Sequence, residues 1–395
     1  MAQRPRAGAL TGLSRSTVFL AFASFFADVS TEMLYPVLPV FLTETLKASG
    51  GVVGLMEGGA LAVQNLVQGV SGSISDRLHR HKRIALIGFG LAALCKPLIG
   101  LASVWPVAVG ARLLERLGTG VRSAPRDALV AASADPEHRG KAFGLEGAGD
   151  NAGAFVGPVL AVILLSLLAV PMRQLFLLAV IPGALAFVMV LFVAETRAAA
   201  PAKATLGAAI TRFPPAYRAY LLAIGLFGLG NSSNAFLILQ TRSLGVSLPV
   251  TILIYAGYNL VAALASYPVG VLADRVGRKR LLAGGMAVFL VAYLGFALSR
   301  SVLITAPLFL LYGLFQGVYR AVGKTLASDF SPEGLRASGL GWYGAVVGLS
   351  GLIASLVAGA LWDHVGHVAV FWFGAALALV GAVATLALVK ERRPA

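Results

Sequence analysis

The chain has 395 residues, of which 58% are hydrophobic and only 12% are charged, and its mean hydropathy is +0.83. A soluble domain carries about a quarter of its residues as charged side chains, so this composition excludes a water-soluble globular protein. The net charge of +15 does not indicate a nucleic-acid partner, because the positive residues sort by loop.

Apolar runs of roughly 20 residues, the length that crosses a hydrocarbon core of about 30 Å as a helix, recur from end to end. We therefore predict an all-α membrane protein with twelve transmembrane helices, each satisfying its own backbone groups. The first span is interpreted as a retained helix because no cleavage site follows it. The expected spans are 17–45, 51–75, 84–104, 106–131, 141–169, 173–194, 219–244, 249–273, 281–299, 302–327, 339–361 and 368–388.

Lysine and arginine residues outside these spans concentrate in both termini and in alternate loops. The remaining loops hold only Lys47, Arg173, Arg242 and Arg300. The positive-inside rule therefore predicts a multi-pass protein of a bacterial inner membrane with both termini in the cytoplasm. The longest polar stretch, 195–218, is predicted to be a cytoplasmic linker between two six-helix bundles, 1–194 and 219–395.

The sequence offers little for metal or cofactor chemistry. Its single cysteine, Cys95, lies inside a predicted span, and the five histidines fall in predicted loops or at helix ends. A disulfide framework and a cysteine-based metal site are thus excluded. No Gly-x4-Gly-Lys-Ser/Thr loop is present, which disfavours ATP-driven transport, and no soluble catalytic domain is recognised, which disfavours an enzyme. We expect no metal and no cofactor.

Two loops repeat about half a chain length apart, as expected for a transporter built from two similar halves. The segment GSISDRLHRHKR (Gly72–Arg83) is matched by GVLADRVGRKR (Gly270–Arg280). This pattern resembles the signature loop of the major facilitator superfamily, and the resemblance covers the whole chain. It implies two six-helix bundles related by internal pseudo-two-fold symmetry, and a loop that latches the halves on the cytoplasmic side. A topological anchor of basic residues is the alternative. The gating residues implied are Gly72, Asp76, Arg77, Arg80, Gly270, Asp274, Arg275 and Arg278.

The fourth span contains Arg112, Glu115 and Arg116 on one helix face. It resembles the fourth-helix motif of the superfamily, in which an arginine precedes a glutamine and a pair of glycines. Glu115 stands in the glutamine place and Arg116 in a glycine place. Charge at this depth must face a partner or a wet cavity. Proton coupling and a structural counter-ion role for Glu115 are both open.

The fifth span carries Gly144, Gly153, Gly157 and Pro158. This pattern resembles the antiporter motif of drug:proton exchangers, except that its closing glycine pair is replaced by Ala161 and Val162. In the family the motif accompanies export. Glycines four residues apart also leave one helix face without side chains and allow a neighbouring helix to approach closely. Tight packing is therefore the alternative interpretation.

The first span carries two acids, Asp28 and Glu32, on one helix face, with Tyr35 nearby. An ionised carboxylate within the membrane is heavily penalised, whereas a neighbouring arginine stabilises it. Such a group can switch between protonated and arginine-paired forms, as proton coupling requires. By resemblance to superfamily exporters we pair Asp28 or Glu32 with Arg112. A static ion pair that stabilises the N-terminal bundle is the alternative.

The spans of the second half are almost free of acids and offer neutral polar groups instead. We predict that the first half handles protons and that the second half contacts substrate. A lone polar residue in a span can also serve only to form a hydrogen bond between helices, which contributes ~0.6 kcal/mol. The substrate-binding candidates are Tyr35, Glu57, Gln64, Asn231, Asn234, Tyr255, Asn259, Tyr312 and Gln316.

These features predict a proton-coupled exporter, an antiporter of small organic molecules that works by alternating access. One alternative is an importer or facilitator of a polar nutrient, an anionic solute or a metal chelate on the same fold. Another is a lipid translocase or a non-transporting sensor. The expected partners are a small-molecule substrate, protons and the lipid bilayer, and the chain is expected to act as a monomer.

Overall fold

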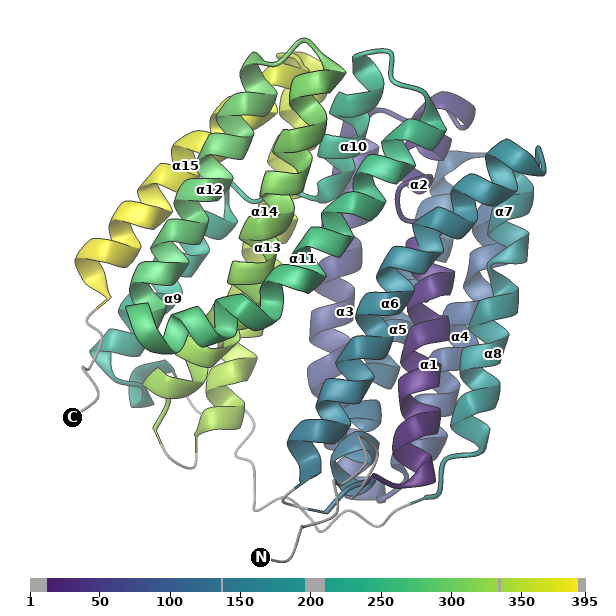
Figure 1. Cartoon of the computed structure of the whole chain (residues 1–395), viewed down its shortest axis with the longest axis vertical. Helices are drawn as coiled ribbons and strands as arrows, with labels where there is room; N and C mark the ends of the chain where they lie inside the picture. Colours follow the sequence, from purple (N-terminus) through teal and green to yellow (C-terminus); the bar gives the residue numbers. More distant parts are fainter. Residues whose placement is uncertain (1–12, 136–137, 196–209, 333–334, 390–395) are drawn as a thin grey trace, which may run out of the picture.

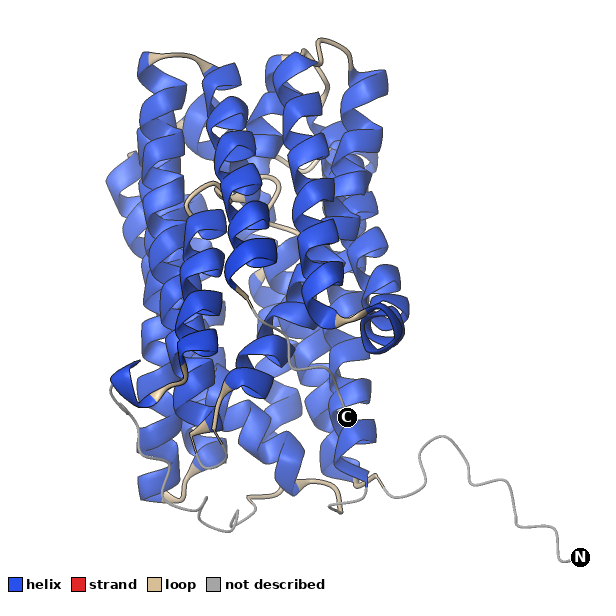
Figure 2. Ribbon diagram, turned by 90° about the vertical axis from the view of Figure 1, so that its left-hand side faces the viewer, coloured by secondary structure: helices blue, strands red, loops and turns tan. Residues whose placement is uncertain are grey.

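The structure, a computed structural model, describes residues 13–135, 138–195, 210–332 and 335–389. Within these ranges the chain is helical apart from turns, loops and one isolated bridge between Leu13 and Ala134 (Figure 2). Every expected span corresponds to a helix or to a pair of helices in line. Eight described helical segments are long and apolar enough to cross a membrane by length and composition alone. The predicted all-α membrane fold is thereby confirmed.

The helices form two groups that stand side by side, and the start of α1 and the end of α15 point toward the same end of the molecule (Figure 1). We call this the terminal end and the opposite one the far end. The N-terminal bundle contains α1 (Arg15–Glu32), α2 (Leu38–Val40), α3 (Gly50–Leu78), α4 (His81–Leu101), α5 (Trp105–Ala132), α6 (Arg139–Val162), α7 (Met172–Leu178) and α8 (Val180–Leu191). The C-terminal bundle contains α9 (Pro215–Gly228), α10 (Asn234–Ser243), α11 (Leu248–Val276), α12 (Arg278–Leu298), α13 (Val302–Phe330), α14 (Arg336–His364) and α15 (His367–Leu388). Short π-helical turns, Phe41–Thr45 and Ile163–Leu167, extend α2 and α6.

Two expected spans are broken rather than continuous. The first span stops at Glu32 and resumes as α2 at Leu38, and Pro36 and Pro39 lie in or next to this break. The corresponding span of the second half breaks between α9 and α10. Proline lacks the backbone donor that a helix needs, and glycine weakens a helix. Broken helices are tolerated at membrane depth only where protein or water covers the backbone, so both breaks point inward.

The linker prediction needs one correction. Helix α9 begins at Pro215, a favoured first helical residue, so residues 215–218 belong to the C-terminal bundle rather than to the linker. Residues 196–209 lie outside the described ranges.

The bundles touch along α3 and α14. A Cβ atom added at Gly58 would lie 3.0 Å from Leu352, and one added at Gly348 would lie 2.9 Å from the side chain of Asn65. The same test finds open space at Gly344 and at Gly341, toward the terminal end. The two helices therefore meet at the far end and separate toward the terminal end, as Figure 1 shows.

The two bundles have different interiors. The C-terminal bundle is filled by one large aromatic cluster, in which the rings of Phe289 and Tyr293 stack at 3.9 Å and Tyr312 lies among its neighbours. The N-terminal bundle has two smaller apolar clusters, one of which also includes Ala235, Leu239 and Ile252 of the C-terminal bundle. Buried charged side chains lie in the N-terminal bundle. Burial of aromatic rings stabilises the C-terminal bundle, whereas the N-terminal bundle contains the charged side chains whose burial costs desolvation free energy.

Candidate functional site

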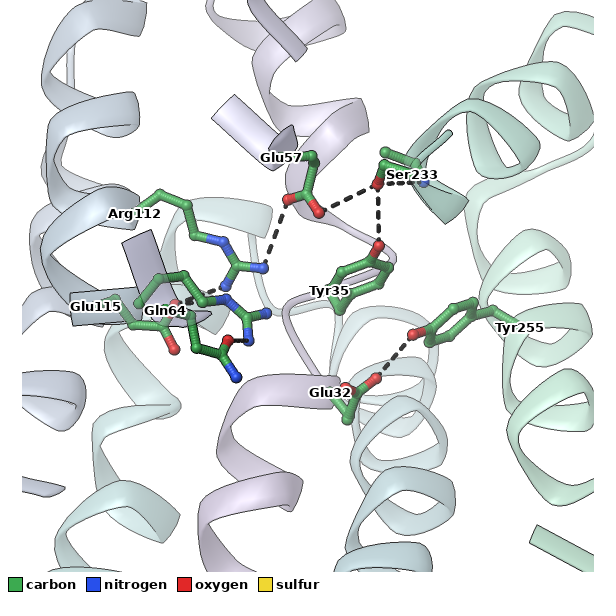
Figure 3. Close-up of polar contacts among 10 residues, drawn as sticks. Glu32, Tyr35, Glu57, Gln64, Arg112, Glu115, Ser233 and Tyr255 are labelled. Atoms are coloured by element: carbon green, nitrogen blue, oxygen red, sulfur yellow. Dashed lines mark hydrogen bonds and ion pairs between the residues drawn. The ribbon is translucent and has the colours of Figure 1, made fainter. Parts of the chain in front are cut away.

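A cluster of charged side chains is buried in the N-terminal bundle (Figure 3). Arg112 of α5 is 2% exposed and donates to Glu115, which is 0% exposed, at 2.8 Å. Its other terminal nitrogen lies 3.5 Å from the carboxylate of Glu57 on α3. Arg116 lies 3.4 Å from Glu115 and donates to Gln64 at 3.1 Å. Opposite charges in contact offset part of the desolvation cost of burial.

This geometry corrects the expected pairing of the first-span acids with Arg112. Neither Asp28 nor Glu32 forms an ion pair with Arg112 in the described part of the chain, and the partners of Arg112 are Glu115 and Glu57. The reason is local, because Glu115 lies one turn away on the same helix and reaches Arg112 without crossing to α1. The counter-ion interpretation of Glu115 thus has direct geometric support.

The cluster continues into the C-terminal bundle through Ser233, the residue that precedes α10. Its hydroxyl donates to Glu57 at 3.2 Å and lies 3.2 Å from the hydroxyl of Tyr35. The guanidinium of Arg112 lies 5.9 Å from the centroid of the Tyr35 ring, within the range of a cation–π contact. A charge in one bundle is therefore linked to a helix break in the other (Figure 3).

A second link between the bundles lies one turn away along α1. Tyr255 of α11 donates to the carboxylate of Glu32 at 2.9 Å, and its ring stacks on Tyr35 with centroids 5.3 Å apart (Figure 3). Tyr255 is 3% exposed, whereas Glu32 is only partly buried. Tyr255 is the one residue with which Glu32 forms a hydrogen bond or ion pair among the described residues.

Asp28 lies one turn earlier on α1 and is also partly buried. No hydrogen bond or ion pair of Asp28 is found within the described ranges. The charged groups near enough to interact with it electrostatically include Asp150 of α6 and Arg122 and Arg126 of α5. Arg126 is itself paired with Glu146 at 2.9 Å. Asp28 thus faces a mixed group of charges rather than one fixed partner.

The neutral candidates of the second half form a connected group. Tyr312 donates to Asn234 at 2.9 Å and to Asn231 at 3.3 Å, and Asn234 donates to Tyr258 at 3.0 Å. This network ties the break after α9 to α11 and α13. Because these side chains form hydrogen bonds with one another, they stabilise the conformation of the break between α9 and α10.

Two further candidates are Asn259 and Gln316, and the second adjoins that network at Tyr258. Asn259 of α11 donates to the backbone carbonyl of Ala154 on α6 at 3.1 Å and joins the bundles. Gln316 of α13 carries a side-chain oxygen that is buried without a hydrogen-bond partner. An unsatisfied buried acceptor is costly, which singles out Gln316 as a side chain able to receive a donor from a ligand or from a moving neighbour.

The glycine pattern of the fifth span has a packing role in the structure. A Cβ atom at Gly157 would lie 2.8 Å from the backbone of α1 at Val29 and Met33, and one at Gly153 would lie 2.9 Å from the Cβ of Asp28. Pro158 is buried inside α6, whereas Gly144 borders open space. The glycines thus let α6 lie against the helix that carries both acids.

The predicted gating loops lie at the terminal end. Arg77 is in the last turn of α3, and Arg80 precedes α4. Arg278 begins α12 and forms an ion pair with Asp329 at the end of α13. Arg278 and Gly270 help to line a cavity of about 360 Å³. Gly72 packs near Ala124 of α5 and Arg275 is exposed. The side chains of Asp76 and Asp274 lie outside the part of the chain that the structure describes.

Sequence reasoning missed two contacts that join the bundles at the far end, and one of them is the ion pair between Arg242 and Glu44. The carboxylate of Asp363, near the end of α14, accepts the backbone N–H groups of Gly50 and Gly51 at 2.8 and 2.7 Å. A carboxylate at a helix N-terminus satisfies free donors and complements the helix dipole. An aspartate at the end of one span and a glycine pair at the start of another were the available signals, but neither reveals that the two helices are neighbours.

The structure also places a lysine inside the N-terminal bundle. Lys96 of α4 is 3% exposed and donates to Ser30 at 2.6 Å and to Thr31 at 3.1 Å.

Among the residues described, no group of three or more His, Cys, Asp or Glu side chains is placed so that it could hold a metal ion.

The sequence is similar to those of known membrane transporters over most of its length. The sequence model of the Major Facilitator Superfamily matches residues 20–222 and 220–395. An uncharacterized MFS-type transporter of Methanocaldococcus jannaschii is 35% identical over 358 residues, which cover 89% of each chain. A tetracenomycin C resistance and export protein of Streptomyces glaucescens is 30% identical over 137 residues, covering 35% of this chain and 26% of that protein.

The fold is similar to that of solved transporters. The crystal structure of a D-xylose-proton symporter superposes with a TM-score of 0.78 at 15% sequence identity, covering 95% of this chain and 98% of that one. The family match spans both halves, and the relatives are transporters rather than enzymes. The chain therefore belongs to the major facilitator superfamily and is a multi-pass membrane transporter.

Proposed function

We propose that this chain is a proton-coupled secondary transporter of small organic molecules and that Glu32 is its principal proton-binding residue. The observation that carries the proposal is the hydrogen bond from Tyr255 to Glu32, which crosses between the bundles at 2.9 Å. A carboxylate whose bonded partner sits on the other bundle changes its surroundings whenever the bundles move. Protonation and movement are then linked, as alternating access requires.

The two bundles are assigned different roles in transport. The charged cluster around Arg112 and Glu115 holds the N-terminal bundle together. Glu32 contacts the C-terminal bundle through Tyr255, and Asp28 lies one turn away among the charges of α5 and α6. The C-terminal bundle presents tyrosine, asparagine and glutamine side chains from α10, α11 and α13. Protons are thus assigned to the first half and substrate contacts mainly to the second.

The orientation of the chain in the membrane is assigned from its positive residues. By the positive-inside rule the terminal end is assigned to the cytoplasm, so the observed state is closed to the outside and opens toward the cytoplasm. The contact between Asp363 and the start of α3 is then an outer latch. The chain is assigned a bacterial inner membrane and a monomeric state.

Export is the direction that the α6 pattern favours, because the same pattern accompanies export in the family that it resembles. One of the relatives is a resistance and export protein. Uptake of a polar or anionic solute is the second candidate. It is favoured by Arg320 of α13, an exposed cation with Glu32 and Asp28 among its electrostatic neighbours.

Proteoliposomes with an imposed pH gradient test the function. We would follow radiolabelled tetracenomycin C and D-xylose, the compounds that the two named relatives handle, together with benzoate, in vesicles that are acidic inside or outside. Flux that follows the pH gradient in the wild type and is lost in Glu32→Gln is the expected result. Flux indifferent to the gradient, or equal in the variant, would overturn the coupling proposal, and the sign of the effect separates proton antiport from proton cotransport.

A further inference from the structure

Arg320 of α13 stands out among the cations of the described helices. It lies ten residues before the end of α13 at Phe330, about 15 Å along the helix axis. Its side chain is exposed, and it forms no hydrogen bond or ion pair with any residue that the structure describes. At this depth a guanidinium must face a partner or water rather than lipid.

The surroundings of Arg320 show which of these it faces. The charged groups near enough to interact with it electrostatically include Glu32 and Asp28 of α1, and the phenol groups of Tyr258 and Tyr255 of α11 lie nearby. Those residues lie on both sides of the space between the bundles. Arg320 therefore lies on the side of α13 that approaches α1 and α11, and its exposed side chain does not face the lipid surface.

The same face of α13 continues with polar groups. Gln316 is one turn before Arg320 and Lys324 is one turn after it, so the three side chains lie along one stripe. The side-chain oxygen of Gln316 is buried without a partner, and Lys324 is exposed. A charged fork, an amide and an ammonium group thus line one wall, and tyrosine rings adjoin them.

We infer that the transported solute is an organic anion and that Arg320 binds its carboxylate. Planar guanidinium groups bind carboxylates through two parallel hydrogen bonds. The partly exposed ring of Tyr35, which stacks on the buried ring of Tyr255, offers an apolar surface for the body of the solute. This inference rests on the proposed function and adds the chemical class of its substrate.

The acids opposite Arg320 define how anion and proton interact. A solute carboxylate at Arg320 lies near Glu32, and two negative charges there repel each other. Binding of the anion is therefore strengthened when Glu32 is neutral. The anion and a proton therefore favour each other's binding, which for this substrate class supports the second candidate, uptake, rather than export.

Binding of matched carboxylates and amides to the purified full-length chain tests the inference. The probes are benzoate and 4-phenylbutyrate against benzamide and 4-phenylbutyramide, at constant ionic strength, with isothermal titration and thermal shift as readouts. We expect at least one carboxylate to bind and stabilise the wild type while its amide does not. Arg320→Gln should weaken that binding roughly tenfold or more, since a charge-assisted hydrogen bond is lost.

Three variants sharpen the test. Arg300→Gln removes an exposed cation from the loop before α13 and should leave carboxylate binding unchanged. Arg320→Lys keeps the charge but loses the fork, so it should retain the preference for carboxylates at lower affinity. Glu32→Gln should bind the carboxylate more tightly than the wild type.

The inference is overturned if amides bind as well as carboxylates, if no carboxylate binds, or if Arg320→Gln binds like the wild type. An Arg320→Gln variant that fails to fold moves the decision to Arg320→Lys, whose unchanged affinity would equally overturn a forked contact. These binding measurements need no pH gradient. Failure of proton coupling in proteoliposomes with intact anion binding would reject the proposed function and leave the anion site standing.

Discussion

Tyr255 on α11 donates a hydrogen bond to Glu32 on α1 across 2.9 Å, and this bond joins the two bundles at the level where the first span breaks. The same tyrosine stacks on Tyr35 from the opposite bundle. A titratable group and an aromatic contact therefore share one interface. Any movement that separates α1 from α11 must break both.

Replacing Tyr255 by phenylalanine isolates the hydrogen bond, because the ring and its stacking remain. A hydrogen bond to a charged group contributes about 1.5–3 kcal/mol, so Tyr255→Phe should favour opening of the far end. Accessibility of single cysteines at the far end to a thiol reagent measures this, in a background where the buried Cys95 is replaced. Tyr217→Phe, in which a tyrosine bonded only within its own bundle is changed, is the control. Equal accessibility in both variants would contradict the role of the bond.

Asp363 supplies a second test of the far-end contact. Its carboxylate accepts two N–H groups at the start of α3, and removing such a cap costs about 0.5–2 kcal/mol. Asp363→Ala should therefore shift the population toward the state open at the far end, whereas Asp363→Asn should shift it less. Asp329→Ala, which breaks an ion pair at the terminal end, provides the comparison. A shift of the same sign and size in Asp329→Ala would argue against a latch at Asp363.

The buried charge cluster predicts an unequal response to two carboxylate substitutions. Glu115→Gln leaves Arg112 buried with a weaker partner, and breaking a buried pair costs about 3–5 kcal/mol. Glu44→Gln removes a half-exposed partner of Arg242, and such surface pairs contribute about 0–1 kcal/mol. Thermal unfolding in detergent should show a large loss of stability for the first change and a small one for the second. Similar melting temperatures would contradict the structural role of Glu115.

The glycine pattern of α6 can be tested with a matched pair of alanine substitutions. A Cβ atom at Gly153 would clash with the backbone oxygen of Phe25 and would lie 2.9 Å from the Cβ of Asp28, whereas Gly147 has open space around it. Gly153→Ala should therefore displace α1 and reduce stability and transport together. Gly147→Ala should leave both near the wild-type level. If the two variants behave alike in thermal unfolding and flux assays, close packing of α6 on α1 is not required.

Hydropathy predicted the membrane spans well, because lipid as the solvent forces long apolar helices. It did not predict the breaks after Glu32 and after Gly228, where proline, glycine and polar residues interrupt a run whose average stays apolar. Helix periodicity placed Arg112, Glu115 and Arg116 on one face. It could not identify the helix that this face meets, so Glu57 rather than a first-span acid proved to be the partner from another helix.

The central claim is that protonation of Glu32 controls the opening of the far end, and the distance between the bundles there reports on it directly. Spin labels at Leu168 and Val250, exposed positions at the far ends of the two bundles, would be measured by pulsed electron resonance with Cys95 replaced. The ionised carboxylate is the stronger acceptor for Tyr255, so the distance in the wild type should lengthen from pH 8 to pH 5.5. In Glu32→Gln it should already be long at pH 8 and should not change with pH. A Glu32→Gln protein that shows the wild-type pH response would contradict the account.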